Sequence, residues 1–104
     1  MDWSYDLAYF FAGAFFANSL PHLVNGVSGR SFQTPFAKPP GKGLSSPTVN
    51  VLWGFFNLAV AYLLAVYVGG FGIHDPWHVA IVGTGVLVMS LIHARAFGRF
   101  HSSQ

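Results

Sequence analysis

Apolar residues along the chain form three long blocks, and polar residues are concentrated between them. The blocks cover about residues 4–27, 47–69 and 76–98. Each block is apolar on all sides of a helix, and each is near the roughly 20 residues that a helix needs to cross a bilayer. The pattern therefore predicts an all-α integral membrane protein with three transmembrane helices, folded as one domain over residues 1–104.

Local signals mark where the second and third helices begin. Ser46 followed by Pro47, and Asp75 followed by Pro76, each supply a helix cap and a first-turn proline. Pro21 lies inside the first block, and because proline lacks a backbone N–H we expect that helix to bend there. The segment 30–46 between the first two blocks is rich in proline and is predicted to be a loop.

Composition supports a membrane location. Only 8% of the residues are charged and the mean hydropathy is +0.50, whereas about a quarter of the residues in soluble domains are charged. A β-barrel would require alternating apolar and polar positions, which the blocks lack.

The cations lie in two clusters beside apolar blocks, so we expect no nucleic-acid binding. The chain has no Cys, which excludes disulfides and thiolate metal sites. The acidic start argues against a cleaved signal peptide.

All cations fall on one side of the predicted membrane, and the three Asp residues fall on the other side. By the positive-inside rule the N-terminus is outside, and the loop and the C-terminus are cytoplasmic. Anionic lipid headgroups would attract cations at that surface. The candidate headgroup contacts are Arg30, Lys38, Lys42, Arg95 and Arg99.

The loop itself is predicted to lie on the membrane. Phe32 and Phe36 are expected to dip into the interface, so that the loop forms a cap over the polar residues of the spans. The lipid bilayer is therefore the first partner that the sequence indicates.

Polar residues inside the predicted spans share helix faces. Within each block they are three, four or seven residues apart, which places them on one side of a helix. Because the spans alternate in direction, these residues all fall in the cytoplasmic half of the membrane. We call the predicted cluster the polar seam; it comprises Asn18, His22, Asn25, Asn50, Asn57, Ser90 and His93.

Three interpretations of the polar seam remain open. Its amides and imidazoles can hold the helices together through hydrogen bonds of about 0.6 to 2 kcal/mol each, without any chemistry. They can instead line a cavity or binding site that the loop closes. They can also drive association into a homo-oligomer.

Metal and haem sites are poorly supported. His22 and His93 are the best axial pair for a haem, but a seam rich in Asn is not an apolar slot. His74 and His78 have the spacing of zinc ligands, but Pro76 interrupts the helical turn between them. We therefore expect no metal and no cofactor.

Catalytic and transport chemistry is similarly limited. The chain has no Glu and no acidic residue within a span, which excludes the embedded carboxylate of small multidrug exporters. A proton relay through His22 stays open, since imidazole titrates near neutral pH. Ser19 and Ser90 lie near histidines, but no Asp completes a hydrolytic site. We therefore expect that the protein is not an enzyme.

The segment PHLVNGVSGRSFQTPFAKPPGKGLSSPTVNVLWGFFNL, from Pro21 to Leu58, carries a distinctive series of short motifs. It begins with Pro-His, continues with Gly-x-x-Gly-Arg and Thr-Pro-Phe, and ends with Ser-Ser-Pro and Val-Asn-Val-x-Trp-Gly. This series resembles that of a group of small, uncharacterised bacterial integral membrane proteins. The resemblance implies a bacterial cytoplasmic membrane and supplies no activity. The matching residues are Pro21, His22, Gly26, Gly29, Arg30, Thr34, Pro35, Phe36, Ser45, Ser46, Pro47, Val49, Asn50, Val51, Trp53 and Gly54.

Two functional hypotheses follow. The first is a structural or interaction subunit that associates with itself or with a larger membrane partner. The alternative is a transporter or binding protein for a small polar or amphipathic ligand, which would use the polar seam. A structural subunit should tolerate His22→Gln, whereas a ligand or proton site should lose activity with that change and keep its fold.

Overall fold

The computed structural model describes residues 3–101 and contains three long helices. Helix α1 spans Trp3–Val27, α2 spans Pro47–Tyr62 and α3 spans Pro76–His101. Helix α2 continues directly into a π-helix, η1, over Leu63–Val68. Three helical segments, with α2 and η1 counted as one, are long and apolar enough to cross a membrane. The predicted all-helical architecture with three candidate spans is therefore confirmed.

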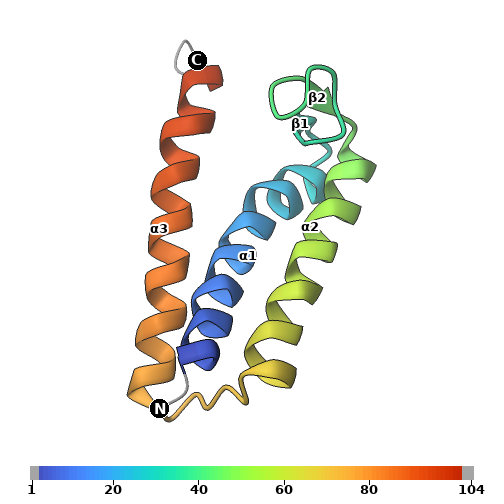
Figure 1. Cartoon of the computed structure of the whole chain (residues 1–104). Helices are drawn as coiled ribbons and strands as arrows, with labels where there is room; N and C mark the ends of the chain where they lie inside the picture. The colour runs from blue at the N-terminus through green and yellow to red at the C-terminus, as the bar shows by residue number, and fades with distance from the viewer. Residues whose placement is uncertain (1–2, 102–104) are drawn as a thin grey trace.

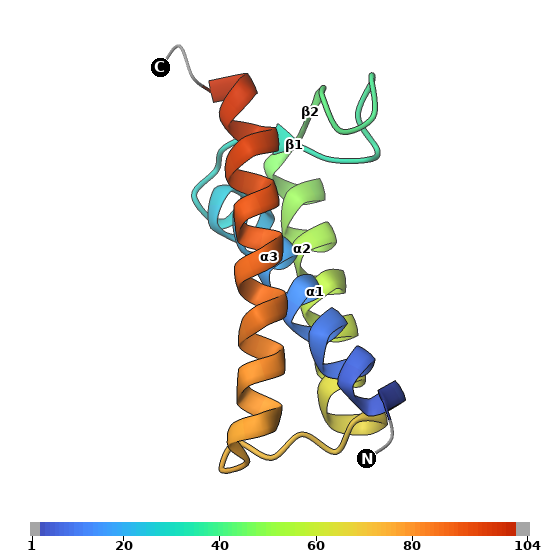
Figure 2. The ribbon, with the colours of Figure 1, turned by 60° about the vertical axis from the view of Figure 1, so that its left-hand side comes forward.

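Helix α1 is the central element of the fold (Figure 1). It contacts α2 and η1 as well as α3, whereas α2 and α3 make almost no contact with each other. In the turned view of Figure 2 the axis of α1 is again inclined to that of α3. Half of the buried residues in the described part of the chain belong to α1. The stability of the helix arrangement therefore depends on the two interfaces that α1 makes.

Glycines bring α1 and α3 into close contact. A Cβ atom on Gly13 would clash with the carbonyl group of Val82 on α3, and one on Gly85 would clash with the carbonyl group of Phe10 on α1. By contrast, a Cβ on Gly83 would have no atom within 4 Å. Small residues at membrane-helix interfaces allow this kind of backbone approach, so Gly13 and Gly85 set the closest contact between these helices.

Helices α2 and α3 each begin with the capping residue that the sequence indicates. The Ser46 side chain accepts a hydrogen bond from the N–H of Val49 at 3.2 Å, and the Asp75 carboxylate accepts one from the N–H of Trp77 at 2.9 Å. These bonds satisfy N–H groups that have no partner within the helix. Helix α1 runs without a break through Pro21, and α3 continues to His101 rather than ending near residue 98.

The second span does not stay α-helical to residue 69, as the apolar pattern suggested. Its last six residues form η1, and Gly70 ends the helix with a φ of 61°, which glycine adopts at little steric cost. The N–H of Phe71 donates to the carbonyl of Ala65 at 2.8 Å. The Tyr9 hydroxyl of α1 donates to the carbonyl of Gly69. The contact between Tyr9 of α1 and Gly69 thus accompanies the π-helical turns of η1. The spacing of apolar residues does not predict this contact.

The connection between α1 and α2 forms a small ordered unit that we call the cap, residues 30–46. Strands β1 (Phe32–Gln33) and β2 (Leu44–Ser45) pair in antiparallel orientation, with Phe32 opposite Ser45. The hydroxyl groups of Thr34 and Ser45 are hydrogen-bonded at 2.5 Å. The sequence predicted a loop without strands, because strands of two residues are too short to leave an alternating pattern.

Candidate functional site

Asn50, in the first turns of α2, is the centre of the polar seam. It is fully buried, with 0% of its surface exposed. Its side-chain nitrogen donates to the backbone carbonyls of Phe32, Ser45 and Ser46 at 3.2, 3.1 and 3.0 Å. Its side-chain oxygen lies 2.8 Å from Nδ1 of His22 on α1. One amide therefore joins both strands of the cap, the start of α2 and helix α1.

The bonds of Asn50 also determine the tautomer of His22. Three carbonyl oxygens surround one end of the Asn50 amide, so that end must be the donating nitrogen. The oxygen of the amide then faces His22 and accepts a hydrogen bond from the protonated Nδ1. In the neutral imidazole Nε2 is consequently an acceptor, and this atom has no hydrogen-bond partner among residues 3–101.

A second amide pair lies one turn deeper along α1. The Asn18 nitrogen donates to the Asn57 oxygen at 2.9 Å, and the Asn57 nitrogen donates to the backbone carbonyl of Trp53 at 2.8 Å. Asn57, like Asn50, has none of its surface exposed. The structure thus brings four seam residues together as two pairs across the α1–α2 interface.

Asn25 has a different role. Its side-chain nitrogen donates to the carbonyl of Pro21 at 2.7 Å, and its oxygen accepts from Nε of Arg30 at 3.1 Å. The backbone carbonyl of Asn25 also accepts the N–H groups of Ser28 and Arg30. Asn25 therefore organises the C-terminal end of α1 instead of crossing to α2.

Of the two α3 residues expected in the seam, His93 lies beside it and Ser90 does not, and Phe97, which was not expected, contacts His22. Ser90 is exposed on α3 and does not join the cluster. It lies about 140° around the helix from Gly85, the residue that faces α1, which explains its outward position. His93 is partly buried against the ring of Phe97, at 5.1 Å. The Phe97 ring in turn contacts Phe32 of the cap at 4.8 Å.

A pocket with a volume of about 560 Å³ lies between the cap and the C-terminal part of α3. Polar groups of α1 and the cap form part of its wall, and aromatic rings of α2 and α3 form another part. None of the described residues that line it is acidic. We call it the cap pocket; its lining includes Asn18, His22, Thr34, Lys42, Trp53, Phe97, Arg99 and Phe100.

The structure separates the five cations predicted to contact headgroups. Arg30 is hydrogen-bonded to Asn25. Lys38 and Arg95 are exposed and do not line the cap pocket, whereas Lys42 of the cap and Arg99 of α3 do. Two cations from different elements therefore belong to one cavity that also contains the seam residue His22.

Phe32 and Phe36, which were expected to lie together in the membrane interface, have different environments. Phe32 is buried, with 8% of its surface exposed, and its ring lies 5.6 Å from that of His22. Phe36 is exposed and its ring contacts Trp53 at 5.0 Å. The expectation for Phe32 was wrong, because the carbonyl of this residue is held by Asn50 inside the cap.

Sequence reasoning missed several residues of this region. Gln33 and Thr34 are buried in the cap, and the Thr34 hydroxyl accepts the N–H of Phe36 at 3.2 Å. A Thr directly before a proline is the one signal that pointed to this turn. The contribution of Phe97 had no sequence signal, since apolar residues occur on every side of α3.

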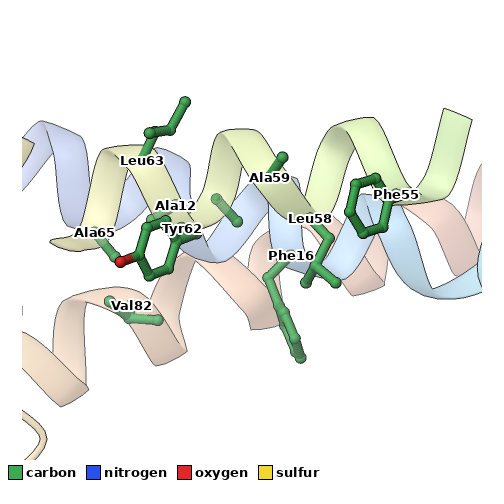
Figure 3. A pocket seen from close by; sticks show the side chains of 10 residues that line it. Ala12, Phe16, Phe55, Leu58, Ala59, Tyr62, Leu63, Ala65 and Val82 are labelled. Atoms are coloured by element: carbon green, nitrogen blue, oxygen red, sulfur yellow. The ribbon is translucent and has the colours of Figure 1, made fainter. Parts of the chain in front are cut away.

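A larger hollow, of about 680 Å³, lies on another part of the surface (Figure 3). Side chains of α2 and η1 form most of its wall, with Ala12 and Phe16 of α1 and Val82 of α3 completing it. The hydroxyl of Tyr62 is its one side-chain polar group. Because precisely placed polar groups are what orient a bound headgroup, this apolar groove suits the acyl chains of the surrounding bilayer.

Another polar cluster lies at the opposite end of the molecule. His78 accepts the N–H of Gly72 at Nδ1 (3.0 Å), and its Nε2 lies 3.2 Å from the Tyr9 hydroxyl and 3.3 Å from the Asp75 carboxylate. These bonds hold the turn between η1 and α3 against α1. Among residues 3–101, no group of three or more His, Cys, Asp or Glu side chains is placed to hold a metal ion.

Comparison with known proteins identifies no relative. No family model, no curated protein and no solved structure matches this chain.

Proposed function

We propose that this protein is a non-enzymatic membrane protein that binds a small amphipathic ligand in the cap pocket. The observation that carries the proposal is the composition of this single cavity of about 560 Å³, in which aromatic walls meet His22 and Asn18. Small-molecule sites are commonly cavities of this size with mostly apolar walls and a few placed polar groups. The amides of the seam are engaged within the chain, which leaves Nε2 of His22 for a ligand.

The orientation of the protein is part of this proposal. All five cations belong to the cap or to the last turns of α3, and Asp6 and Asp75 belong to the opposite end. This asymmetry favours a cytoplasmic cap and an outside N-terminus. The resemblance of residues 21–58 favours the cytoplasmic membrane of a bacterium. Because the chain has no Cys, a Lys38→Cys variant should react with an impermeant maleimide only after the cells are opened; labelling in intact cells would contradict this orientation.

Filling the cavity tests the binding function. Ala96 lines the cap pocket, and Ala94, two residues away on α3, is exposed and does not line it. The protein is incubated with a mixture of single-chain lipids of different headgroups, and bound lipid is measured by native mass spectrometry. Ala96→Phe should reduce bound lipid about tenfold or more, because its ring occupies the cavity. Ala94→Phe should bind as much as the unchanged protein, and equal binding by all three would refute the function.

A second function, as a structural or interaction subunit, is favoured by a different observation on α3. Residues at a heptad-like spacing on this helix are small and exposed, a surface that suits close contact with another membrane helix. Disulfide crosslinking tests association into a homo-oligomer: Ser90→Cys should form dimers in membranes, and Ile92→Cys, on another face at similar depth, should not. The small exposed residues are Ala80, Gly83, Ser90 and Ala94.

A further inference from the structure

The polar groups of the cap pocket differ in kind according to their position. Lys42 and Arg99, both exposed, contribute positive charge from the cap and from the last turns of α3. His22 is only 2% exposed and contributes an acceptor nitrogen from inside α1. Asn18 lies one turn further along α1, about 6 Å from His22 along the helix axis. The cavity thus combines a cationic outer part with an inner part that accepts hydrogen bonds.

Among residues 3–101 the positive charge of this cavity has no acidic partner. No acidic residue in that range lines the cavity, and none forms a salt bridge with Lys42 or Arg99. Lys and Arg side chains both bind phosphate, Arg through two parallel hydrogen bonds. A phosphate monoester carries between one and two negative charges near neutral pH, which matches two cations.

The inner part of the cavity requires a donor from its ligand. With Nδ1 bound to Asn50, the neutral His22 ring can only accept at Nε2. A hydroxyl group next to the phosphate satisfies this requirement. The rings of Trp53 and Phe97 line the same cavity and provide an apolar surface for the first part of an acyl chain.

Resting on the binding function proposed above, we infer that the cap pocket recognises a phosphate monoester with a neighbouring hydroxyl. The phosphate lies between Lys42 and Arg99, and the hydroxyl donates to Nε2 of His22. Two sources share this chemistry, a single-chain lipid such as 1-acyl-glycerol 3-phosphate and the soluble ester glycerol 3-phosphate. The aromatic wall favours the lipid.

The cation contribution is measured with 1-acyl-glycerol 3-phosphate as the probe and native mass spectrometry as the readout. Lys42→Gln and Arg99→Gln should each weaken binding about fivefold, and together about 25-fold, as expected for cations near a headgroup. Lys38→Gln and Arg95→Gln are the matched controls, one on the cap and one on α3, and should leave the affinity unchanged. An equal effect of all four changes would show general surface attraction and overturn the inference.

The hydroxyl contribution is measured by changing the ligand, so that folding of the protein is not affected. The 2-O-methyl form of the same lipid cannot donate and should bind the unchanged protein about fivefold more weakly. In His22→Ala, which has no acceptor at this position, methylation should make no difference. Equal binding of both lipids to the unchanged protein would refute the role of His22 in recognition.

Further ligands separate this inference from the general binding function. Lysophosphatidylcholine has a hydroxyl and no net charge, and it should bind more weakly than the phosphate monoester. If it binds equally well and Ala96→Phe abolishes its binding, the binding function stands and the inference fails. If no lipid responds to Ala96→Phe, both fail. Glycerol 3-phosphate, added at the concentration at which the lipid saturates the protein, should not compete with the lipid. Competition would identify the soluble ester as the ligand.

Discussion

The two interfaces of α1 are built differently. Against α2, close approach at Gly26 and Gly54 is accompanied by side-chain hydrogen bonds, Asn18 with Asn57 and His22 with Asn50. Against α3, the interior contact consists of backbone approach at glycines, and the side-chain hydrogen bonds in the described residues lie near one end, where Tyr9 meets His78. Directional bonds fix the rotation and depth of one helix relative to another, whereas packing at glycines fixes mainly their distance of approach.

This difference explains where the cap pocket lies. Asn50 binds the cap to α1 and α2, so these elements form one unit at that end. Helix α3 reaches the same end through the aromatic contact between Phe97 and Phe32. The cavity lies between this hydrogen-bonded unit and α3.

The largest effect is expected when the centre of the α1–α2 side is removed. Asn50→Leu removes the side-chain donor to three carbonyls and the acceptor of His22, although the Ser46 carbonyl keeps the backbone N–H of residue 50. A buried polar group without a partner costs about 1–3 kcal/mol. We expect a loss of at least about 3 kcal/mol in the free energy of unfolding in SDS, with faster proteolysis of the cap. Thr48→Ala, an exposed change on the same turn, serves as the control. A decrease in the free energy of unfolding smaller than the contribution of one hydrogen bond would mean that packing alone holds the cap in place.

An intermediate effect is expected on the α1–α3 side. Gly85→Ala places a Cβ against the carbonyl of Phe10, and overpacking of this kind costs about 1–3 kcal/mol. Gly83→Ala, two residues away, meets open space and should not destabilise the protein. The same SDS titration compares them. Equal stability of the two variants would show that α3 shifts freely along α1, and the close contact would then have no energetic role.

The smallest effect tests whether the deeper amide pair is energetically coupled. A double-mutant cycle with Asn18→Ala and Asn57→Ala should give a coupling of about 0.6 kcal/mol, the average for hydrogen bonds between membrane helices. As a control, a cycle that combines Asn25→Ala with Asn57→Ala should show no coupling. The Asn25 side chain donates to the carbonyl of Pro21 on its own helix and not to α2. Coupling with Asn25 would indicate that the amides stabilise the interface collectively rather than as pairs.

The sequence identified most residues of the polar seam, but it did not show which of them pair with each other. Spacing placed Asn18 and His22 on one face and Asn50 and Asn57 on another, and the structure pairs these residues across α1 and α2. Spacing gave Ser90 the same status, although the rotation of α3 exposes it. A helix that is apolar on all sides has no stripe that reveals which face meets a neighbour.

The sequence by itself determined the three helical spans and the concentration of cations at one end. In hydrocarbon every backbone polar group must be hydrogen-bonded within its own segment, so a long apolar run that follows a helix-capping residue forms a helix. Only the tertiary structure decided the π-helical end of the second span, the strand pairing of the cap, and which two cations share a cavity with His22. These features depend on contacts between segments far apart in the chain, such as Tyr9 with Gly69 and Asn50 with Phe32, and local spacing contains no information about which distant group becomes the partner.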